Sequence, residues 1–221
     1  MSNGKVSKKI QQVFPTIEQV SFQVLIEAYK GITNCNQYDL DWEEEQFNQE
    51  LVVFMRKSRL RTKYKLTIGV ERKLFNEEQS PIDTNNPKKL PRIDINIVSW
   101  SFQKDIELEY FFEAKNLSEK NWYKKSGAKV DAPSYQRRYI QTGIENFRTG
   151  RYYNGSLVGY ILEGEIEPIL NKLNSRLVKD TNSLKIIDKI NFIKDFSHCY
   201  ESRHITFSSN EINIKHIFFK F

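Results

Sequence analysis

Arg92-Ile93-Asp94-Ile95 and Phe112-Glu113-Ala114-Lys115 are two short runs in which charged residues interrupt apolar sequence. An unpaired charge among isoleucine, leucine, valine and phenylalanine costs on the order of several kcal/mol. The buried charges therefore need partners, or a ligand that offsets this cost. A divalent metal ion that faces a phosphodiester is such a ligand.

Both runs read as β-strands, in which successive side chains point to opposite faces. Glu113 and Lys115 are two residues apart, so they point to the same face. A hairpin turn centred near Gln103 and Lys104 would set Asp94 opposite Glu113. We therefore expect the three charged side chains to converge on one patch of a sheet.

The elements around the two runs are expected in the order helix, three strands, helix, strand. Helices are inferred from the spacing of apolar residues and from an acidic residue at the N-terminus. Strands are inferred from alternating apolar and polar residues, and loops are inferred from Pro and Asn. The expected elements are a helix opening at Asp41 with a stripe of Phe47, Leu51, Phe54 and Met55, a strand over 64–70, a loop over 74–90, the two motif strands, a helix over 134–147 and a strand over 156–162.

In this setting, Arg92-Ile93-Asp94 and Glu113-Ala114-Lys115 resemble the motif of the PD-(D/E)XK nuclease superfamily. That family carries an Asp near the start of one strand and Glu/Asp-x-Lys on the next. The sequence departs from the pattern directly before Asp94, where Ile93 stands, and its proline is Pro91. The resemblance covers residues 41–163. It implies an α/β, restriction-endonuclease-like core, αβββαβ, with a mixed central sheet flanked by helices.

The whole chain, 1–221, is expected to form one nuclease domain around this core. Residues 1–40 would be an N-terminal extension, loose over 1–9 and helical over 16–30. Residues 164–221 would be a C-terminal α+β elaboration, with helices over 166–178 and 183–196 and strands over 204–207 and 212–219. The last strand would extend the core sheet or form a dimer edge.

The resemblance also implies a site for metal-dependent phosphodiester hydrolysis. Asp94 and Glu113 would be Mg²⁺ ligands, together with the carbonyl of Ala114, and Mn²⁺ would be able to substitute. Lys115 would orient the attacking water or stabilise the transition state. The alternative is an Asp–Lys–Glu salt-bridge cluster on an exposed sheet face.

Many members of the family add a metal-proximal acid on the first core helix. The choices are Glu43, Glu44, Glu45 and Glu50. Glu44 is preferred because it lies beside the apolar stripe, and Glu45 is second. In the alternative interpretation, all four acids only solvate the start of the helix.

The basic composition fits a polyanionic partner. Lys and Arg number 34 against 28 Asp and Glu, which gives a net charge of +6 and a pI near 9.1. The candidate nucleic-acid contacts follow the catalytic strand, in a loop with interleaved aromatics and in the next helix. They are Lys120, Lys124, Lys125, Gln136, Arg137, Arg138 and Gln141. The loop lysines could instead belong to a solvated, flexible segment.

We therefore expect a DNA endonuclease of restriction or antiviral (phage) defence. The alternatives are a catalytically silent nucleic-acid-binding or scaffolding subunit of a defence complex, and an RNA-cleaving effector. The sequence has no Walker loop, so an ATPase or recognition function would come from a partner subunit, and a homodimer would suit double-strand cutting. No signal peptide or long apolar stretch is present, which favours a cytoplasmic protein without membrane contact. Cys35 and Cys199 are too few for a disulfide framework.

Overall fold

The computed structural model describes residues 3–73, 92–101 and 106–221. The expected loop over 74–90 and the expected turn at Gln103 and Lys104 lie outside the described residues. The elements are α1 Asn3–Asn34, α2 Glu44–Met55, α3 Arg59–Lys63, β1 Leu66–Lys73, β2 Arg92–Ser101, β3 Ile106–Ser118, β4 Trp122–Tyr123, β5 Lys129–Val130, α4 Ala132–Arg138, the π-helical segment η3 Tyr139–Ile144, α5 Glu145–Arg148, β6 Gly155–Glu163, α6 Ile166–Leu177, β7 Ser183–Lys189, β8 Cys199–Ile205 and β9 Glu211–Lys220.

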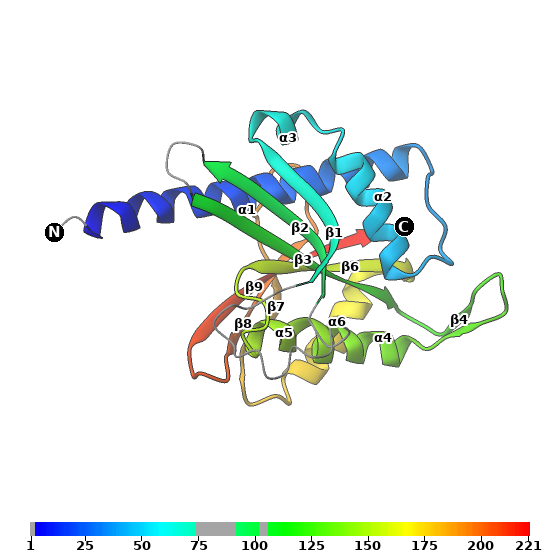
Figure 1. Ribbon diagram of the computed structural model, residues 1–221. Coiled ribbons are helices and arrows are strands. Elements are labelled where there is room, and N and C mark those ends of the chain that lie inside the picture. The colour runs from blue at the N-terminus through cyan, green and yellow to red at the C-terminus, as the bar shows by residue number, and fades with distance from the viewer. Residues whose placement is uncertain (1–2, 74–91, 102–105) are drawn as a thin grey trace, which may run out of the picture.

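Seven of the described strands form one mixed sheet in the order β1-β2-β3-β6-β9-β8-β7 (Figure 1). The β1, β2 and β3 strands are antiparallel neighbours, whereas β3 and β6 are parallel. The chain crosses from β3 to β6 through α4, η3 and α5, as a parallel connection requires. The α/β class and the mixed, helix-flanked sheet expected from the sequence are confirmed.

The register of β2 on β3 decides where the charged residues meet. Ser101 pairs with Ile106 and Ile95 pairs with Phe112. Continuing this register by one residue sets Asp94 opposite Glu113, the pairing expected from a hairpin turn centred near Gln103 and Lys104.

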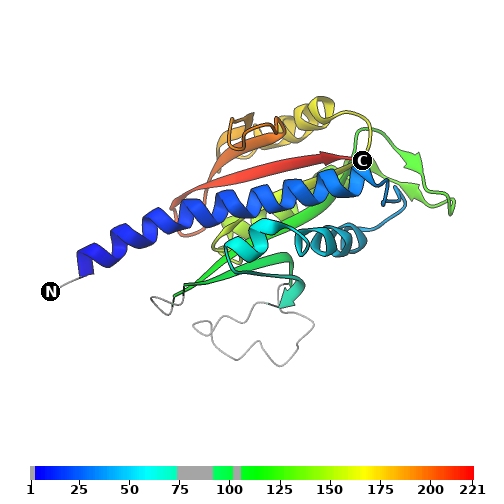
Figure 2. The same cartoon turned by 90° about the horizontal axis from the view of Figure 1, so that it is seen from above.

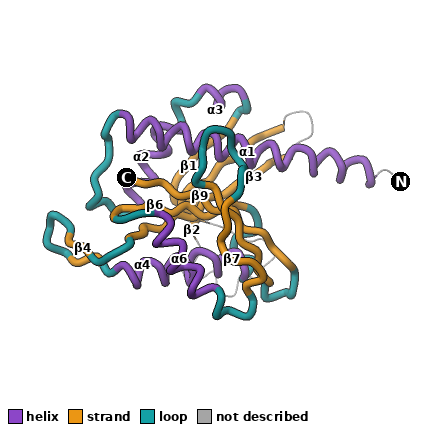
Figure 3. Tube along the Cα trace, turned by 180° about the vertical axis from the view of Figure 1, so that it is seen from behind, coloured by secondary structure: helices purple, strands orange, loops and turns teal. Residues whose placement is uncertain are grey.

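Helices cover both faces of the sheet. The α1 and α2 helices lie on one side, and α4 and α6 on the other, in views from the front and from behind (Figure 3). Phe22 and Leu51 pack with Phe112 in one buried cluster, while Leu173 packs with Phe218 in the other. The N-terminal part of α1 and the β4–β5 hairpin project from opposite ends of the body (Figure 2).

The C-terminal region joins the same sheet, because β9 pairs with β6 and β8 pairs with β9. The helix expected over 183–196 is wrong: Ser183–Lys189 is the edge strand β7, with Ile187 buried. Ile186 and Ile187 are β-branched neighbours that suit a strand, and their pairing with β8 overrides the helix-like spacing. The β8 strand also begins earlier than the expected 204–207.

Two helix starts differ from expectation. The α1 helix begins at Asn3, so most of the segment expected to be loose over 1–9 is helical. The α2 helix begins at Glu44 after the N-cap Glu43, whose side chain forms a capping box with Gln46. Asp41 therefore lies outside the helix that it was expected to cap. No helix among the described residues is long and apolar enough to cross a bilayer.

Candidate active site

Glu113 and Lys115 of β3 are enclosed by the fold. Glu113 is 6% exposed and Lys115 is 5% exposed. Phe111 and Leu117 stand on either side of this pair on the same face of the strand, and both belong to the apolar cluster beneath α4 and α6. The strand therefore carries a carboxylate and an ammonium group into an apolar setting, where each needs a partner.

Lys115 is the centre of this charge cluster. Its Nζ donates to Glu113 Oε1 at 2.5 Å and to the Ala114 carbonyl at 2.8 Å. Asp94 Oδ2 lies 3.9 Å from the same Nζ, and Glu44 Oε2 lies 4.0 Å from it. One ammonium group thus lies within 4.0 Å of carboxylates from β2, β3 and α2.

Asp94 lies where β2 and β3 begin to separate. The last residue pair between these strands at this end is Ile95 with Phe112. Beyond it, Asp94 Oδ2 accepts a hydrogen bond from the backbone N–H of Ala114 at 2.7 Å. The side chain therefore takes the place of the next ladder bond and is fixed beside Lys115.

The opposite neighbour of Asp94, on β1, has an unusual backbone. The pairs Val70–Ile95 and Arg72–Ile93 set Glu71 between them, across from Asp94. Glu71 has φ 51°, in the left-handed region that a glutamate rarely adopts. No feature of the sequence signalled this strained position next to the site.

Glu44 is held by a backbone group of β3 and by a side chain of α4. Its Oε1 accepts from the backbone N–H of Asn116 at 3.0 Å, and its Oε2 accepts from Arg138 of α4 at 3.2 Å. Glu45 is exposed. Of the two helix acids proposed from the sequence, Glu44 is the one that the structure brings to Lys115.

Burial and mutual charge shift the ionisation of the cluster. Burial first, and then the charge of Glu113, raise the pKa of Asp94 to about 8. Burial also raises the pKa of Glu113. Burial acts to lower the pKa of Lys115, but the carboxylates of Glu113, Asp94 and Glu44 outweigh it and the pKa is raised. These pKa shifts favour a cationic Lys115 and a protonated Asp94 in the metal-free cluster.

One carboxylate oxygen in the cluster lacks a partner. Glu113 Oε2 is buried and accepts no hydrogen bond from the described residues. The hydroxyl of Tyr152 interacts with the Glu113 carboxylate and acts to lower its pKa, but the proton of this hydroxyl is donated to the carbonyl of Arg92 at 2.7 Å. A buried oxygen of this kind is costly unless a ligand satisfies it.

Carboxylate oxygens are ligands of the kind that a hard divalent cation prefers. Asp94 and Glu113 offer carboxylates, and the Asp94 side chain is 21% exposed, so solvent reaches it. Mg²⁺ prefers oxygen ligands and keeps several waters, and proteins bind it through one or two carboxylates together with substrate phosphates. The third expected ligand, the Ala114 carbonyl, already accepts from Lys115. Across the described residues, no three His, Cys, Asp or Glu side chains are gathered in coordination geometry.

The lysines expected to contact nucleic acid just after β3 are engaged by acids instead. Lys124 Nζ donates to Glu43 Oε1 at 2.5 Å and to the Asp41 carbonyl at 2.8 Å. Lys125 Nζ donates to Asp39 Oδ2 at 2.7 Å. These contacts tie the β4–β5 hairpin to the loop before α2.

The remaining candidates divide by position. Gln136 is buried, and its amide donates to the Ser118 carbonyl at 3.0 Å. Arg138 reaches the cluster through Glu44, whereas Arg137 and Gln141 are exposed and do not join it. Lys120 is also exposed and lines a separate groove. Asn116 was not foreseen, because its backbone N–H rather than its side chain holds Glu44.

No known protein family, curated protein or solved structure matches the chain. The arrangement of its own residues therefore carries the functional argument.

Proposed function

We propose that this protein is a metal-dependent nuclease with a restriction-endonuclease-like core, and that it acts as a DNA endonuclease in restriction or antiviral defence. The observation that carries the proposal is the position of Lys115 Nζ, within 4.0 Å of Asp94, Glu113 and Glu44. These residues come from three separate elements and include the Asp, the Glu and the Lys of the proposed motif.

The order of elements supports the same proposal. Apart from the short elements α3, β4, β5, η3 and α5, the chain runs α2, β1, β2, β3, α4 and then β6, with the Asp on β2 and the Glu-x-Lys on β3. This is the helix, three-strand, helix, strand order implied by the resemblance. The additional strands β9, β8 and β7 extend the sheet beyond β6 and leave this order unchanged.

Asp94 and Glu113 would hold Mg²⁺. When bound, the ion supplies charge stabilisation at the phosphate and lowers the pKa of a coordinated water. Lys115 has three N–H donors, and Glu113 and the Ala114 carbonyl take two of them. The third donor is available to orient the attacking water or to contact a phosphate oxygen, where developing negative charge strengthens the interaction.

Glu44 and Arg138 would position this machinery. Glu44 fixes the start of α2 against β3 and adds negative charge near Lys115, which keeps the ammonium protonated. Arg138 is 48% exposed, so its guanidinium can contact a phosphate while it stays paired with Glu44.

A catalytically silent nucleic-acid-binding or scaffolding subunit is the second candidate. The 2.5 Å contact between Lys115 and Glu113 favours it, because a closed ion pair can satisfy both groups without a metal. The unpartnered Glu113 Oε2 favours the enzyme instead. An RNA-cleaving effector would use the same cluster and differ only in substrate.

Cleavage assays separate these candidates. Plasmid, linear duplex, single-stranded DNA and RNA would each be incubated with Mg²⁺, Mn²⁺ or EDTA. Asp94→Asn removes a proposed ligand, and Glu45→Gln is the matched control on the neighbouring helix. Metal-dependent cutting lost only in Asp94→Asn supports the nuclease and identifies its substrate. Equal cutting by both variants contradicts the assignment of Asp94 to the active site. Metal binding by a wild type that does not cut favours the silent subunit.

A further inference from the structure

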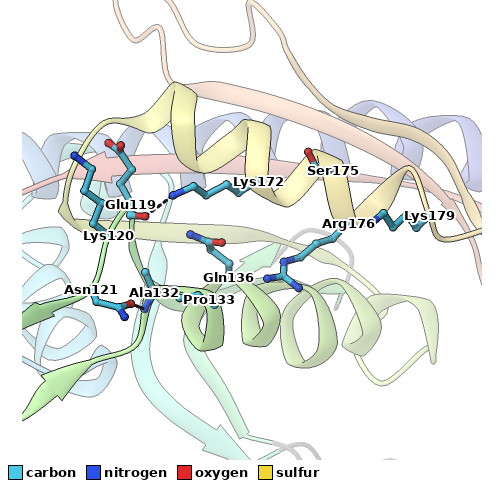
Figure 4. A pocket seen from close by; sticks show the side chains of 10 residues that line it. All are labelled: Glu119, Lys120, Asn121, Ala132, Pro133, Gln136, Lys172, Ser175, Arg176 and Lys179. Atoms are coloured by element: carbon cyan, nitrogen blue, oxygen red, sulfur yellow. Dashed lines mark hydrogen bonds between the residues drawn. The ribbon is translucent and has the colours of Figure 1, made fainter.

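A groove of about 670 Å³ lies between α4 and α6 at the end of β3 (Figure 4). Four cationic side chains line it, Lys120, Lys172, Arg176 and Lys179, against the single carboxylate of Glu119. Lys172 and Arg176 belong to α6, and Lys179 follows the end of that helix by two positions. Lys120 belongs to the segment after β3. The groove therefore concentrates positive charge in a concave surface, where the local potential is strongest.

This charge is not neutralised within the described residues. Lys172 donates to the backbone carbonyl of Glu119 at 2.5 Å, so its partner carries no full charge. The Glu119 carboxylate accepts from the backbone N–H of Glu165 at 3.1 Å. Across the described residues, the side chains of Lys120, Arg176 and Lys179 form no ion pair, although many other basic side chains do.

The α6 helix is organised around this arrangement. Lys172 and Arg176 are four residues apart on one side of α6, and Lys179 follows the end of the helix by two positions. The apolar stripe that includes Ile169 and Leu173 is buried against the sheet. Like charges at this spacing repel one another. The helix dipole favours cations only near the C-terminal turn, so it accounts for neither Lys172 nor Lys120.

The groove lies beside the end of β3, the strand that carries Glu113 and Lys115. Gln136, which lines it, donates to the carbonyl of Ser118, three residues after Lys115 on β3. Three residues of strand span about 10 Å. A nucleic-acid strand with one phosphate at Lys115 would therefore reach the groove within a few nucleotides.

We propose that the groove between α4 and α6 binds the sugar–phosphate backbone of the substrate strand beside the phosphate to be cleaved. The inference rests on the proposed nuclease function for its substrate. Lys120, Lys172, Arg176 and Lys179 supply sequence-independent contacts to phosphates, and Gln136 holds the floor of the groove against β3. Binding here is expected to depend strongly on salt, because each phosphate contact releases counterions.

The test measures binding separately from cleavage. Fluorescence anisotropy of labelled single-stranded and duplex DNA is recorded in EDTA over a range of salt concentrations. The groove variant is Arg176→Glu with Lys179→Glu. The matched control is Lys30→Glu with Lys194→Glu, which changes the net charge equally at two exposed lysines, one on α1 and one after β7. Circular dichroism checks that both variants are folded, and Mg²⁺-dependent cutting is assayed in parallel.

We expect the groove variant to bind at least about ten-fold more weakly, with a salt slope lower by about 1.4 to 1.8, as loss of two phosphate contacts requires. The control should change affinity by less than about three-fold. Equal losses of DNA affinity in the groove variant and the control would overturn the proposed role of the groove. A wild type that binds neither single-stranded nor duplex DNA would overturn it too, as would tight binding of a free mononucleotide in place of a strand. Groove-dependent binding without any cutting supports the groove and contradicts the hydrolytic function. Cutting by the wild type, together with DNA binding that the groove substitutions leave unchanged, would support the hydrolytic function and contradict the groove.

Discussion

Lys115 Nζ lies 2.5 Å from Oε1 of Glu113, and the two residues are separated by a single position on β3. Strand alternation puts both side chains on one face, so the strand itself builds the pair. Both side chains are buried, so burying their charges lowers the stability of the fold unless each partner satisfies the other.

Removing the ammonium group should destabilise the metal-free protein. Lys115→Met leaves Glu113 buried without its cation, and we expect the free energy of unfolding to fall by about 3 kcal/mol. The double variant with Glu113→Gln should recover part of that loss, because no uncompensated charge remains. Urea unfolding in EDTA at neutral pH measures both values. Strictly additive effects of the two substitutions would contradict the coupling.

Asp94 should make the metal-free protein less stable as the pH rises. Its folded pKa of about 8 lies above the ordinary aspartate value, so between about pH 4 and 8 the unfolded chain is ionised while the folded protein keeps the proton. The group therefore favours folding at low pH, and this contribution is lost progressively up to about pH 8.

Asp94→Asn removes this titration while keeping an oxygen that can accept from Ala114. The free energy of unfolding of the variant, minus that of the wild type, should rise with pH by at most about 1.4 kcal/mol per unit. Urea unfolding in EDTA at several values between pH 5 and 8 measures this difference. A difference that stays constant over the range would show that the folded pKa of Asp94 is ordinary.

The helix acids Glu44 and Glu45 should behave differently although they are neighbours. Glu44 contacts Asn116 and Arg138 and lies 4.0 Å from Lys115, whereas Glu45 is exposed. We expect Glu44→Gln to weaken Mg²⁺ binding by about 10- to 100-fold, as loss of a supporting group around a metal does. Glu45→Gln should leave the affinity within about two-fold. Calorimetric titration with Mg²⁺ compares the variants, and equal losses would remove Glu44 from the site.

Close packing of β6 on its neighbours makes Gly159 sensitive to substitution. A Cβ at this position would lie 2.5 Å from Phe218 Cδ1 and 2.9 Å from Leu117 Cδ1. Gly159→Ala should therefore lower the free energy of unfolding by about 1–3 kcal/mol. Gly69→Ala is the matched control in a strand, because nothing lies within 4 Å of its added Cβ. Chemical unfolding of both variants checks the prediction, and equal stability of the two would contradict this packing.

The sequence predicted the parts of the site that depend on local periodicity. Period-two alternation and a symmetric hairpin were sufficient to bring Asp94 toward Glu113 and Lys115, and the apolar stripe of α2 favoured Glu44. The contact of Arg138 with Glu44 joins helices on opposite faces of the sheet, so no local pattern encodes it. The β7 strand was missed because its pairing with β8 is a tertiary effect. Lys124 and Lys125 were assigned to phosphate because their acidic partners lie more than 80 residues away.

The most direct test of the account is single-turnover cleavage of DNA by wild-type protein and by Lys115→Met, with Mg²⁺ and at a temperature where circular dichroism shows both to be folded. We predict that the wild type cuts only with the metal present, and that the variant is slower by about 100-fold or more, because it lacks the cation nearest the reacting phosphate. Metal-dependent cutting at the same rate by both proteins would contradict the assignment of Lys115 and the active site built around it.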